Sequence, residues 1–402
     1  MEKKLSSVAK TTPKLLKCNA RHVQGICDQL AKLVKEMYSL DVDPLTDIAI
    51  CCGQTEAFAA AVFAIIDRGD EVVLFDPSYE TYEACIAMAG GVPVYVALDP
   101  PNWTLDADKF MKSISGRTKA IILNSPHNPT GKVFSRDELE IIAGACCTRD
   151  CLAITDEVYE HITFDKEKHI SLASLPGMQE RTVITSSLSK TFSVTGQMTG
   201  DGLLHLVAIY CAILPSFCRL SGWRVGWAIA PAFIASAIRN IHVKITDSAP
   251  APFQEAALAA LTSPSEYFES LRSVGPKKFL FAWFYEEYEF KRDYIVELLA
   301  GIGFQICFKP QGSFFLFAEL PENCLLSDVE YVKELIKQAG VVAVPGCGFF
   351  HTNLSLEKSS QVDCGYQRRY IRFAFCKSNA TLAAAAQKLG KLLGASGHLM
   401  LN

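Results

Sequence analysis

The sequence lacks an excess of charge of either sign. Its 402 residues carry 39 Lys and Arg against 43 Asp and Glu, which gives a formal net charge of -4. A protein that binds nucleic acid needs a concentrated basic surface, and this composition offers none. We therefore expect no nucleic-acid partner. We also find no internal repeat and no low-complexity tract.

Segments that direct a chain across or into a membrane are also scarce. The N-terminus is basic but has no apolar core like that of a secretory signal, although a transit-peptide fragment has a similar composition. One apolar stretch without charge, Gly202–Cys218, is slightly short for a membrane helix and contains His205 and Pro215. We predict a cytoplasmic chain with no membrane span; a plastid or mitochondrial location is the alternative.

The fifteen cysteines form no CxxC pair and lie near no cluster of histidines. Some are adjacent, as in Cys51-Cys52 and Cys146-Cys147, which suits neither a zinc site nor a secreted domain held by disulfides. We predict reduced thiols in a reducing compartment and no bound metal.

Half of the residues are hydrophobic, enough for a large core in two or three folding units. From residue 47, short β-rich runs alternate with longer helical segments, which predicts an α/β fold with a mostly parallel sheet and helices on both faces. The expected strands are 47–52, 71–75, 92–98, 120–124 and 151–155, and the expected helices are Thr55–Arg68, Tyr79–Ala89, Asp106–Ser113 and Arg136–Cys147. Ligands of such sheets bind at the carboxyl ends of the strands.

After Ala230 the pattern changes. Helical segments expected at Phe233–Val243 and Pro252–Leu261 lead into a long helical region, Glu266–Ala300. A smaller α+β unit follows, with expected helices at Val329–Gln338 and Ala380–Leu393 and expected strands at Phe304–Phe308, Ser313–Leu320, Val341–Val344 and Tyr370–Phe375. We predict an atypical N-terminal segment at 1–21, a large α/β domain at 22–262 and a small C-terminal domain at 263–402.

The stretch Thr182–Thr195 places Lys190 where an apolar run gives way to a cluster of hydroxyls. Burial at such a strand end lowers the pKa of an amine, which can then form a Schiff base with an aldehyde cofactor. An isolated lysine is more often an ordinary solvated loop residue, so this interpretation depends on the other strand ends.

Three of those strand ends carry residues suited to a planar, phosphorylated ligand. Gly53, Gln54 and Thr55 precede a helix and can present N–H groups and a hydroxyl to a phosphate; a simple helix cap is the alternative. Tyr79 can stack on a ring or be a core tyrosine. Two prolines and a glycine fix the loop around Asn128 and direct its amide, which favours a functional loop over an ordinary turn.

Charged residues complete the constellation. Asp156 ends a buried strand, where a carboxylate needs a partner such as a protonated pyridine nitrogen, and Tyr159 follows it; a helix cap is the alternative for Asp156. Arg224 lies between tight glycines and suits a phosphate. Arg372 interrupts an apolar strand and needs an anion, for which a substrate carboxylate would serve.

These motifs resemble those of the class I pyridoxal-phosphate aminotransferases of fold type I. The likeness is to the kynurenine/glutamine/methionine aminotransferase group, including its plant members. It rests on NSPHNPTG, TDEVY, SSLSKTFSVTG, GWRVGW and RYIRFAF in the family's order, over roughly His22–Gly196, Trp223–Ser273 and Tyr288–Leu393. It implies a homodimer that uses pyridoxal 5'-phosphate to move an amino group from an aromatic or sulfur-containing amino acid to a 2-oxo acid.

The resemblance also implies a role for each site residue. Lys190 would be the Schiff-base lysine and general base, and Asp156 the partner of the pyridine nitrogen. The remaining roles are ring hydroxyl contacts from Tyr159 and Asn128, stacking by Tyr79, phosphate binding by Gly53, Gln54, Thr55, Ser187 and Arg224, and substrate carboxylate binding by Arg372 together with Asn128.

The chain departs from the family pattern in three places. The family's N-terminal arm, a Gly-Phe-Pro-Asp-Phe-type segment, is not found before Arg21–Gln24. Arg224 follows Lys190 by 34 residues where the family has eight, so 197–222 is surplus, and 274–287 is a second surplus segment whose Gly-Pro should break a helix. Both resemble retained intron. Two alternatives follow: a catalytically impaired splice isoform acting only as a dimer partner, or a cysteine-conjugate β-lyase.

Overall fold

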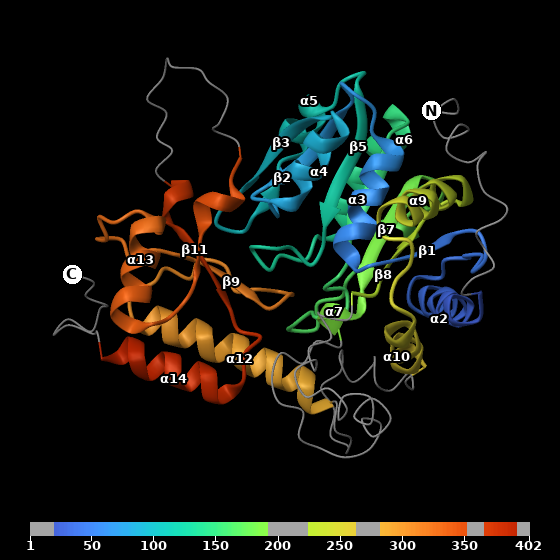
Figure 1. The fold of residues 1–402 in the computed structure, drawn as a ribbon. Coiled ribbons are helices and arrows are strands. Elements are labelled where there is room, and N and C mark those ends of the chain that lie inside the picture. Colours follow the sequence, from blue (N-terminus) through green and yellow to red (C-terminus); the bar gives the residue numbers. More distant parts are fainter. Residues whose placement is uncertain (1–19, 192–223, 263–281, 352–365, 392–402) are drawn as a thin grey trace.

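The computed structural model describes residues 20–191, 224–262, 282–351 and 366–391, which form a larger and a smaller part (Figure 1). In these residues an eight-stranded sheet has the order β1-β8-β7-β6-β5-β2-β3-β4, and a three-stranded sheet has the order β10-β11-β9. The predicted α/β fold, a mostly parallel sheet followed by a smaller α+β unit, is confirmed.

The large sheet is built from short strands joined mainly by helices. Its strands are β1 Ile48–Cys51, β2 Glu71–Asp76, β3 Val92–Asp99, β4 Thr104–Leu105, β5 Thr118–Asn124, β6 Leu152–Asp156, β7 Thr182–Ser187 and β8 Gly226–Ile229. The helices around it are α2 Ala20–Tyr38, α3 Gln54–Ile65, α4 Thr81–Ala89, α5 Ala107–Ser113, α6 Arg136–Arg149, α7 Leu188–Thr191, α9 Ala232–Ile245 and α10 Ala251–Leu261.

The strand directions decide which ends meet. Strands β7, β6, β5, β2 and β3 pair in parallel, so their carboxyl ends share one edge of the sheet. Strand β8 lies antiparallel between β1 and β7, with Gly226 opposite both Cys51 and Ser187. The start of β8 and the ends of β1 and β7 therefore meet at that same edge.

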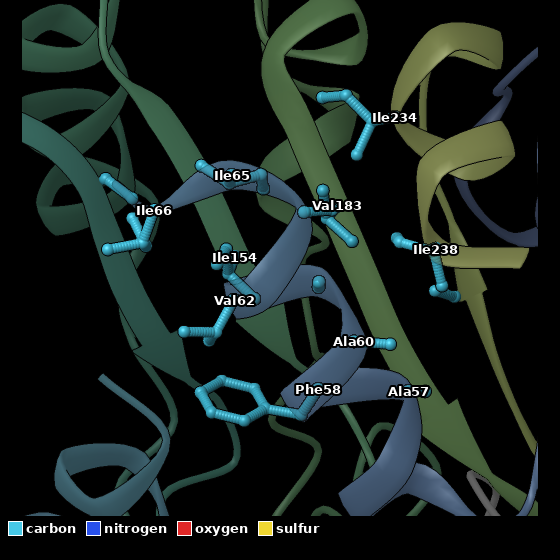
Figure 2. Packing of buried hydrophobic residues seen from close by; sticks show 14 of the residues in the cluster. Ala57, Phe58, Ala60, Val62, Ile65, Ile66, Ile154, Val183, Ile234 and Ile238 are labelled. Carbon is cyan, nitrogen blue, oxygen red and sulfur yellow. The ribbon is translucent and has the colours of Figure 1, made fainter. Parts of the chain in front are cut away.

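Alternation along the strands gives the sheet two apolar faces. On one face Ile154 and Val183 pack against α3 and α9, and Figure 2 shows them beside Val62, Ile234 and Ile238. On the other face, Ala153 of β6 and its counterparts in β2 and β5 pack against α5 and α6. Ile184 of β7 packs there with β1 and β8 against α2 and α10.

Helix α2 was not predicted. Its buried residues Ile26, Leu30 and Val34 recur every fourth position, which forms one apolar stripe that packs on β1 and α10. That spacing is the helical signal that the sequence analysis overlooked. The other predicted helices and strands of the large sheet differ from the structure by a few residues at their ends.

The segment that follows the carboxyl end of β6 contacts the smaller part of the structure. The smaller part contains β9 Phe315–Glu319, β10 Val344–Pro345, β11 Tyr370–Ala374, α12 Ala282–Gly301, α13 Asp328–Ala339 and α14 Asn379–Gly390. The fully buried Arg292 of α12 binds Asp165 with both terminal nitrogens, at 2.5 and 3.0 Å, and lies over the Phe164 ring. This bidentate pair fixes α12 to the segment that follows Asp156 and Tyr159.

Two predicted strands of the smaller part were wrong in extent. Phe304–Phe308 forms only an isolated bridge, in which Gln305 and Glu319 exchange hydrogen bonds. Its apolar alternation resembles a strand, but the chain runs beside β9 for one residue pair only. In the predicted strand Val341–Val344, only Val344 pairs, within β10.

Several predictions fall on other parts of the chain. The surplus segment 197–222, and 274–281 of the second surplus segment with its Gly-Pro, lie outside the described residues, while the backbone of 282–287 begins α12. The proposed domain limits at 22, 262 and 263 stay predictions. Within the described residues, no helix has the length and apolar character to span a membrane.

The packing of α3 against the large sheet predicts that a cavity made between them lowers the stability of the protein. Ile154 is fully buried between α3 and the sheet. Ile154→Ala should lower the free energy of unfolding by about 2–5 kcal/mol, because the methylene groups are lost and the cavity collapses only partly. Ile245→Ala, at a position that is 56% exposed, is the matched control and should cost far less. Equal urea midpoints for the two variants would contradict this packing.

Candidate active site

The predicted site residues follow the ends of adjacent strands at one edge of the large sheet. Lys190 follows β7, Asp156 ends β6, Asn128 follows β5 and Tyr79 follows β2. Register pairs Asn124 with Asp156, which keeps the β5 and β6 ends level. The sheet therefore places residues that are far apart in the sequence at neighbouring strand ends.

Lys190 lies in the single turn α7, mostly withdrawn from water. Its Nζ is 5.3 Å from the centre of the Phe314 ring. Burial lowers the pKa of the Lys190 amine, Arg372 and Arg224 act in the same direction, and Asp156 opposes them. A larger share of uncharged amine at neutral pH suits a nucleophile or a base.

Asp156 is buried and held at both carboxylate oxygens. Tyr82 donates its phenol proton to Oδ2 at 2.6 Å, and the Val158 backbone N–H donates to Oδ1 at 3.2 Å. Burial raises the pKa of Asp156 to about 6, while these two bonds and Lys190 oppose the rise. The carboxyl therefore responds strongly to any positive partner brought against it.

Gly53, Gln54, Thr55 and Arg224 surround the N-terminus of α3. Gly53 has φ 85°, and a Cβ there would lie 2.9 Å from the Arg224 guanidinium. Gly226 lies even closer to the start of α3, since a Cβ added at this position would be 2.4 Å from the Gln54 backbone nitrogen. Arg224 and Thr55 are exposed, so the helix N-terminus, a hydroxyl and a guanidinium are available to one anion.

Two of the residues predicted to bind phosphate already have partners. Gln54 Nε2 donates to Thr185 Oγ1 at 3.4 Å, and the Ser187 hydroxyl accepts the Ser189 N–H at 3.3 Å. Ser187 is buried opposite Gly226. Ser187 can still donate its own hydroxyl proton, because the hydrogen bond in the structure uses only its oxygen as acceptor.

Asn128 and Arg372 join the two sheets. Arg372 Nη1 donates to Asn128 Oδ1 at 2.7 Å, and the Asn128 N–H donates to Asn124 Oδ1 at 2.7 Å. The Arg372 guanidinium lies over two aromatic rings, with its Cζ 4.2 Å from the centre of Phe315 and 4.5 Å from that of Phe349. Among the described residues its Nε has no hydrogen-bond partner although it is buried.

The two predicted tyrosines differ in exposure. Tyr159 is buried, with Phe314 and Phe315 edge-on to its ring at 5.3 and 6.0 Å, and burial raises the pKa of its phenol well above the usual value. Tyr79 is half-buried and meets the Tyr82 ring edge-on at 5.7 Å. Tyr159 therefore keeps its phenol proton at neutral pH, and Tyr79 keeps part of its ring surface accessible.

Comparison with known proteins decides the family. The family model for aminotransferase class I and II matches residues 3–205 and 217–389. Kynurenine–oxoglutarate transaminase 1 of Homo sapiens is 33% identical over 384 residues, which cover 90% of this chain and 81% of that protein. The chain belongs to the class I and II aminotransferases.

Further relatives of this aminotransferase agree. Methionine aminotransferase of Escherichia coli is 32% identical over 372 residues, which cover 92% of this chain and 82% of that protein. The solved structure of N-succinyldiaminopimelate aminotransferase from Mycobacterium tuberculosis has a TM-score of 0.75 at 30% identity, and covers 96% of this chain and 89% of that chain. The chain thus shares the fold of the fold type I aminotransferases, which use pyridoxal phosphate.

The residues of this aminotransferase fit that cofactor. The absence of a side chain at Gly53 lets the Arg224 guanidinium lie against the start of α3, since a Cβ there would be 2.9 Å from it, and a helix N-terminus beside a guanidinium is suited to a phosphate. Asp156 offers a buried carboxylate to a ring nitrogen, and Arg372 Nε offers an unused donor to a carboxylate. The gap in the family match, between 205 and 217, falls inside the surplus segment 197–222. The individual roles of the site residues stay predictions.

Two other features of the aminotransferase bear on the site. Tyr82 was not among the predicted residues, although a second tyrosine three residues after Tyr79, beyond the same strand end, was a usable signal. In the described part of the chain, Cys51, Glu56 and His242 place ligand-type atoms within 4.8 Å of one another. Glu56 already accepts hydrogen bonds from Cys52 N–H and Thr246 and lies 3.0 Å from His242 Nδ1, so we interpret this cluster as a polar link between α3 and α9.

The raised pKa of Asp156 predicts a pH-dependent cost of folding in the cofactor-free protein. The folded state favours the neutral carboxyl, so wild type loses stability as pH rises from about 4 to about 6. The Asp156→Asn variant has no ionisable group at this position, so it does not lose stability in this way. Its stability relative to wild type should rise by about 2 kcal/mol between pH 4 and pH 7 in urea titrations. A difference that stays flat or shrinks would show that the folded carboxyl is not destabilised.

Proposed function

We propose that this chain is a pyridoxal-phosphate aminotransferase that moves an amino group from an aromatic or sulfur-containing L-amino acid, of the kynurenine, glutamine or methionine type, to a 2-oxo acid. One observation carries the proposal. A half-buried amine, Lys190, lies close enough to Asp156 and Arg372 for their charges to act on its pKa. These three groups come from β6, α7 and β11, and their convergence has the chemistry that amino transfer needs.

Pyridoxal phosphate supplies an aldehyde that bonds to amines and a ring that withdraws electrons. Lys190 would be its attachment point and would afterwards accept the α-proton of the amino acid, because its lowered pKa favours the uncharged amine. Asp156 would pair with the ring nitrogen. Phosphate contacts would come from Gly53, Gln54, Thr55, Ser187 and Arg224, ring hydroxyl contacts from Tyr159 and Asn128, and stacking from Tyr79.

The surroundings of Arg372 support an apolar substrate side chain. Its guanidinium contacts the Phe315 and Phe349 rings, and one of its nitrogens donates to Asn128. A substrate α-carboxylate bound there would leave the side chain near aromatic surface, which suits aromatic and thioether groups. The names of the human and Escherichia coli relatives, a kynurenine and a methionine transaminase, support the same class.

A homodimer and a reducing compartment complete the proposal. Aminotransferases of this fold are typically dimers. No cysteine in the described part of the chain forms a disulfide, and most of them are buried, which supports the compartment predicted from cysteine usage.

A substrate panel tests the proposed reaction. Purified chain with cofactor is given kynurenine, phenylalanine, methionine, glutamine, aspartate or N-succinyldiaminopimelate, each with a 2-oxo acid, and the new amino acid is measured. The aromatic and sulfur-containing donors should react fastest. Preference for the succinylated donor would reject the substrate class, and pyruvate released from cysteine conjugates without an acceptor would favour the β-lyase.

Covalent attachment is predicted at Lys190. Borohydride reduction of the cofactor-loaded protein should leave the cofactor mass on the Lys190 peptide in mass spectrometry, because a reduced Schiff base no longer hydrolyses. Lys190→Ala should remove this adduct, whereas Lys109→Ala, at an exposed lysine, should retain it. An adduct on another lysine would move the attachment point.

Arg372→Gln should weaken substrate binding. A lost charge-assisted contact costs about 1.5–3 kcal/mol, so KM for the amino acid should rise by about 10- to 100-fold. Steady-state kinetics with the best donor from the panel measures this effect. Arg136→Gln, at an exposed arginine on α6, should leave KM unchanged. An Arg372→Gln variant with normal KM would place the carboxylate elsewhere.

A further inference from the structure

The shortest side-chain contact of Asp156 is with Tyr82. The phenol oxygen lies 2.6 Å from Asp156 Oδ2, and both residues are almost fully buried. Burial also raises the pKa of Tyr82 far above its ordinary value, so its proton stays in place and the phenol is the donor. This is a charge-assisted hydrogen bond sheltered from water, the class of hydrogen bond with the largest effect on a carboxylate.

Tyr82 is itself held firmly. It lies in the first turn of α4, with the Phe58 ring of α3 at 4.7 Å and the Tyr79 ring edge-on at 5.7 Å. Tyr79 lies two residues before the first residue of α4, and Tyr82 is the second residue of that helix. The segment between β2 and α4, together with the first turn of α4, therefore supplies both the ring predicted to stack on the cofactor and the phenol that binds Asp156.

The second oxygen of the carboxylate is fixed from the other side. Val158 N–H donates to Oδ1 at 3.2 Å, from the turn that follows β6. Two donors, one on α4 and one in that turn, set the plane of the carboxylate. Each oxygen keeps one further lone pair for a partner in the site.

We propose that Tyr82 is a positioning residue for this aminotransferase, which orients Asp156 and keeps it ionised for the cofactor's ring nitrogen. This role rests on the proposed cofactor. Tyr82 acts through Asp156 and needs no contact of its own with the reacting atoms. Without the phenol, the carboxylate would lose one of the two donors that fix its plane.

The charges that face Asp156 explain why the phenol matters. Lys190 on α7 favours the ionised form, while Glu157 beside it and burial disfavour it. Tyr82 on α4 and Val158 N–H are the hydrogen bonds that offset burial, and Tyr159 follows on the same turn. Removing the Tyr82 bond leaves burial less opposed, so Asp156 should take up its proton at a higher pH.

The test uses full-length protein with pyridoxal phosphate as the probe. Its dissociation constant is measured by fluorescence between pH 5.5 and 9 for wild type, Tyr82→Phe, Asp156→Asn and the double variant. Tyr331→Phe is the matched control, because it removes a phenol that is equally buried, lies in the smaller part, and has no hydrogen-bond partner among the described residues. Thermal midpoints verify that all variants fold.

We expect Tyr82→Phe to bind pyridoxal phosphate about tenfold more weakly near pH 7, the size of one charge-assisted hydrogen bond. The pH below which affinity falls should move upward by about one unit. In the Asp156→Asn background, Tyr82→Phe should change neither quantity. Tyr331→Phe should match wild type throughout.

Three results would overturn the role. Tyr82→Phe could match wild type in affinity and pH profile, or it could weaken affinity equally in the Asp156→Asn background, which would indicate packing rather than action through Asp156. Failure of wild type itself to bind pyridoxal phosphate would instead reject the cofactor, and the role of Tyr82 with it. The wild-type measurement therefore separates the two failures.

Discussion

Burial of opposite charges at the ends of neighbouring strands is the constraint on which this site depends. Lys190 follows β7 and Asp156 ends β6, and both are withdrawn from water. Burial shifts both groups toward their neutral forms, while each favours the charged form of the other. The result is an amine and a carboxyl whose protonation depends on what is bound between the strands. A solvated lysine or aspartate would not respond in this way.

The sheet supplies the geometry that this balance needs. Parallel strands bring Asn128 and Asp156 to one edge, and the antiparallel β8 adds Arg224 to the same edge because it starts where its neighbours end. The close approach of Gly226 to the backbone of Gln54 lets β8 lie tightly beside the start of α3. The smaller part then contributes Arg372 from a different sheet, held by its hydrogen bond to Asn128.

The sequence was informative wherever residue type and strand ends coincided. Alternating strands and helices predicted the large sheet, and polar residues after apolar runs marked the positions that the structure brings to one edge. Strand direction was harder to predict, because an apolar run such as Gly226–Ile229 does not show whether its strand pairs in parallel or antiparallel. Tyr82 was missed because its partner is distant in sequence, and Phe304–Phe308 misled because alternation shows an apolar face but cannot show whether a neighbouring strand runs alongside.

The pair of Arg292 and Asp165 has a mechanical consequence. Asp165 is nine residues beyond Asp156 in the chain, and Arg292 lies fully buried on the long helix α12, which also packs against β9 and α14. A displacement of the smaller sheet is therefore transmitted through α12 to the segment that carries Tyr159, by a route that does not pass through the ligand. Loosening that joint would remove one of the links that hold Arg372 in place relative to Asp156, although neither residue had been changed, and the hydrogen bond from Arg372 to Asn128 would remain.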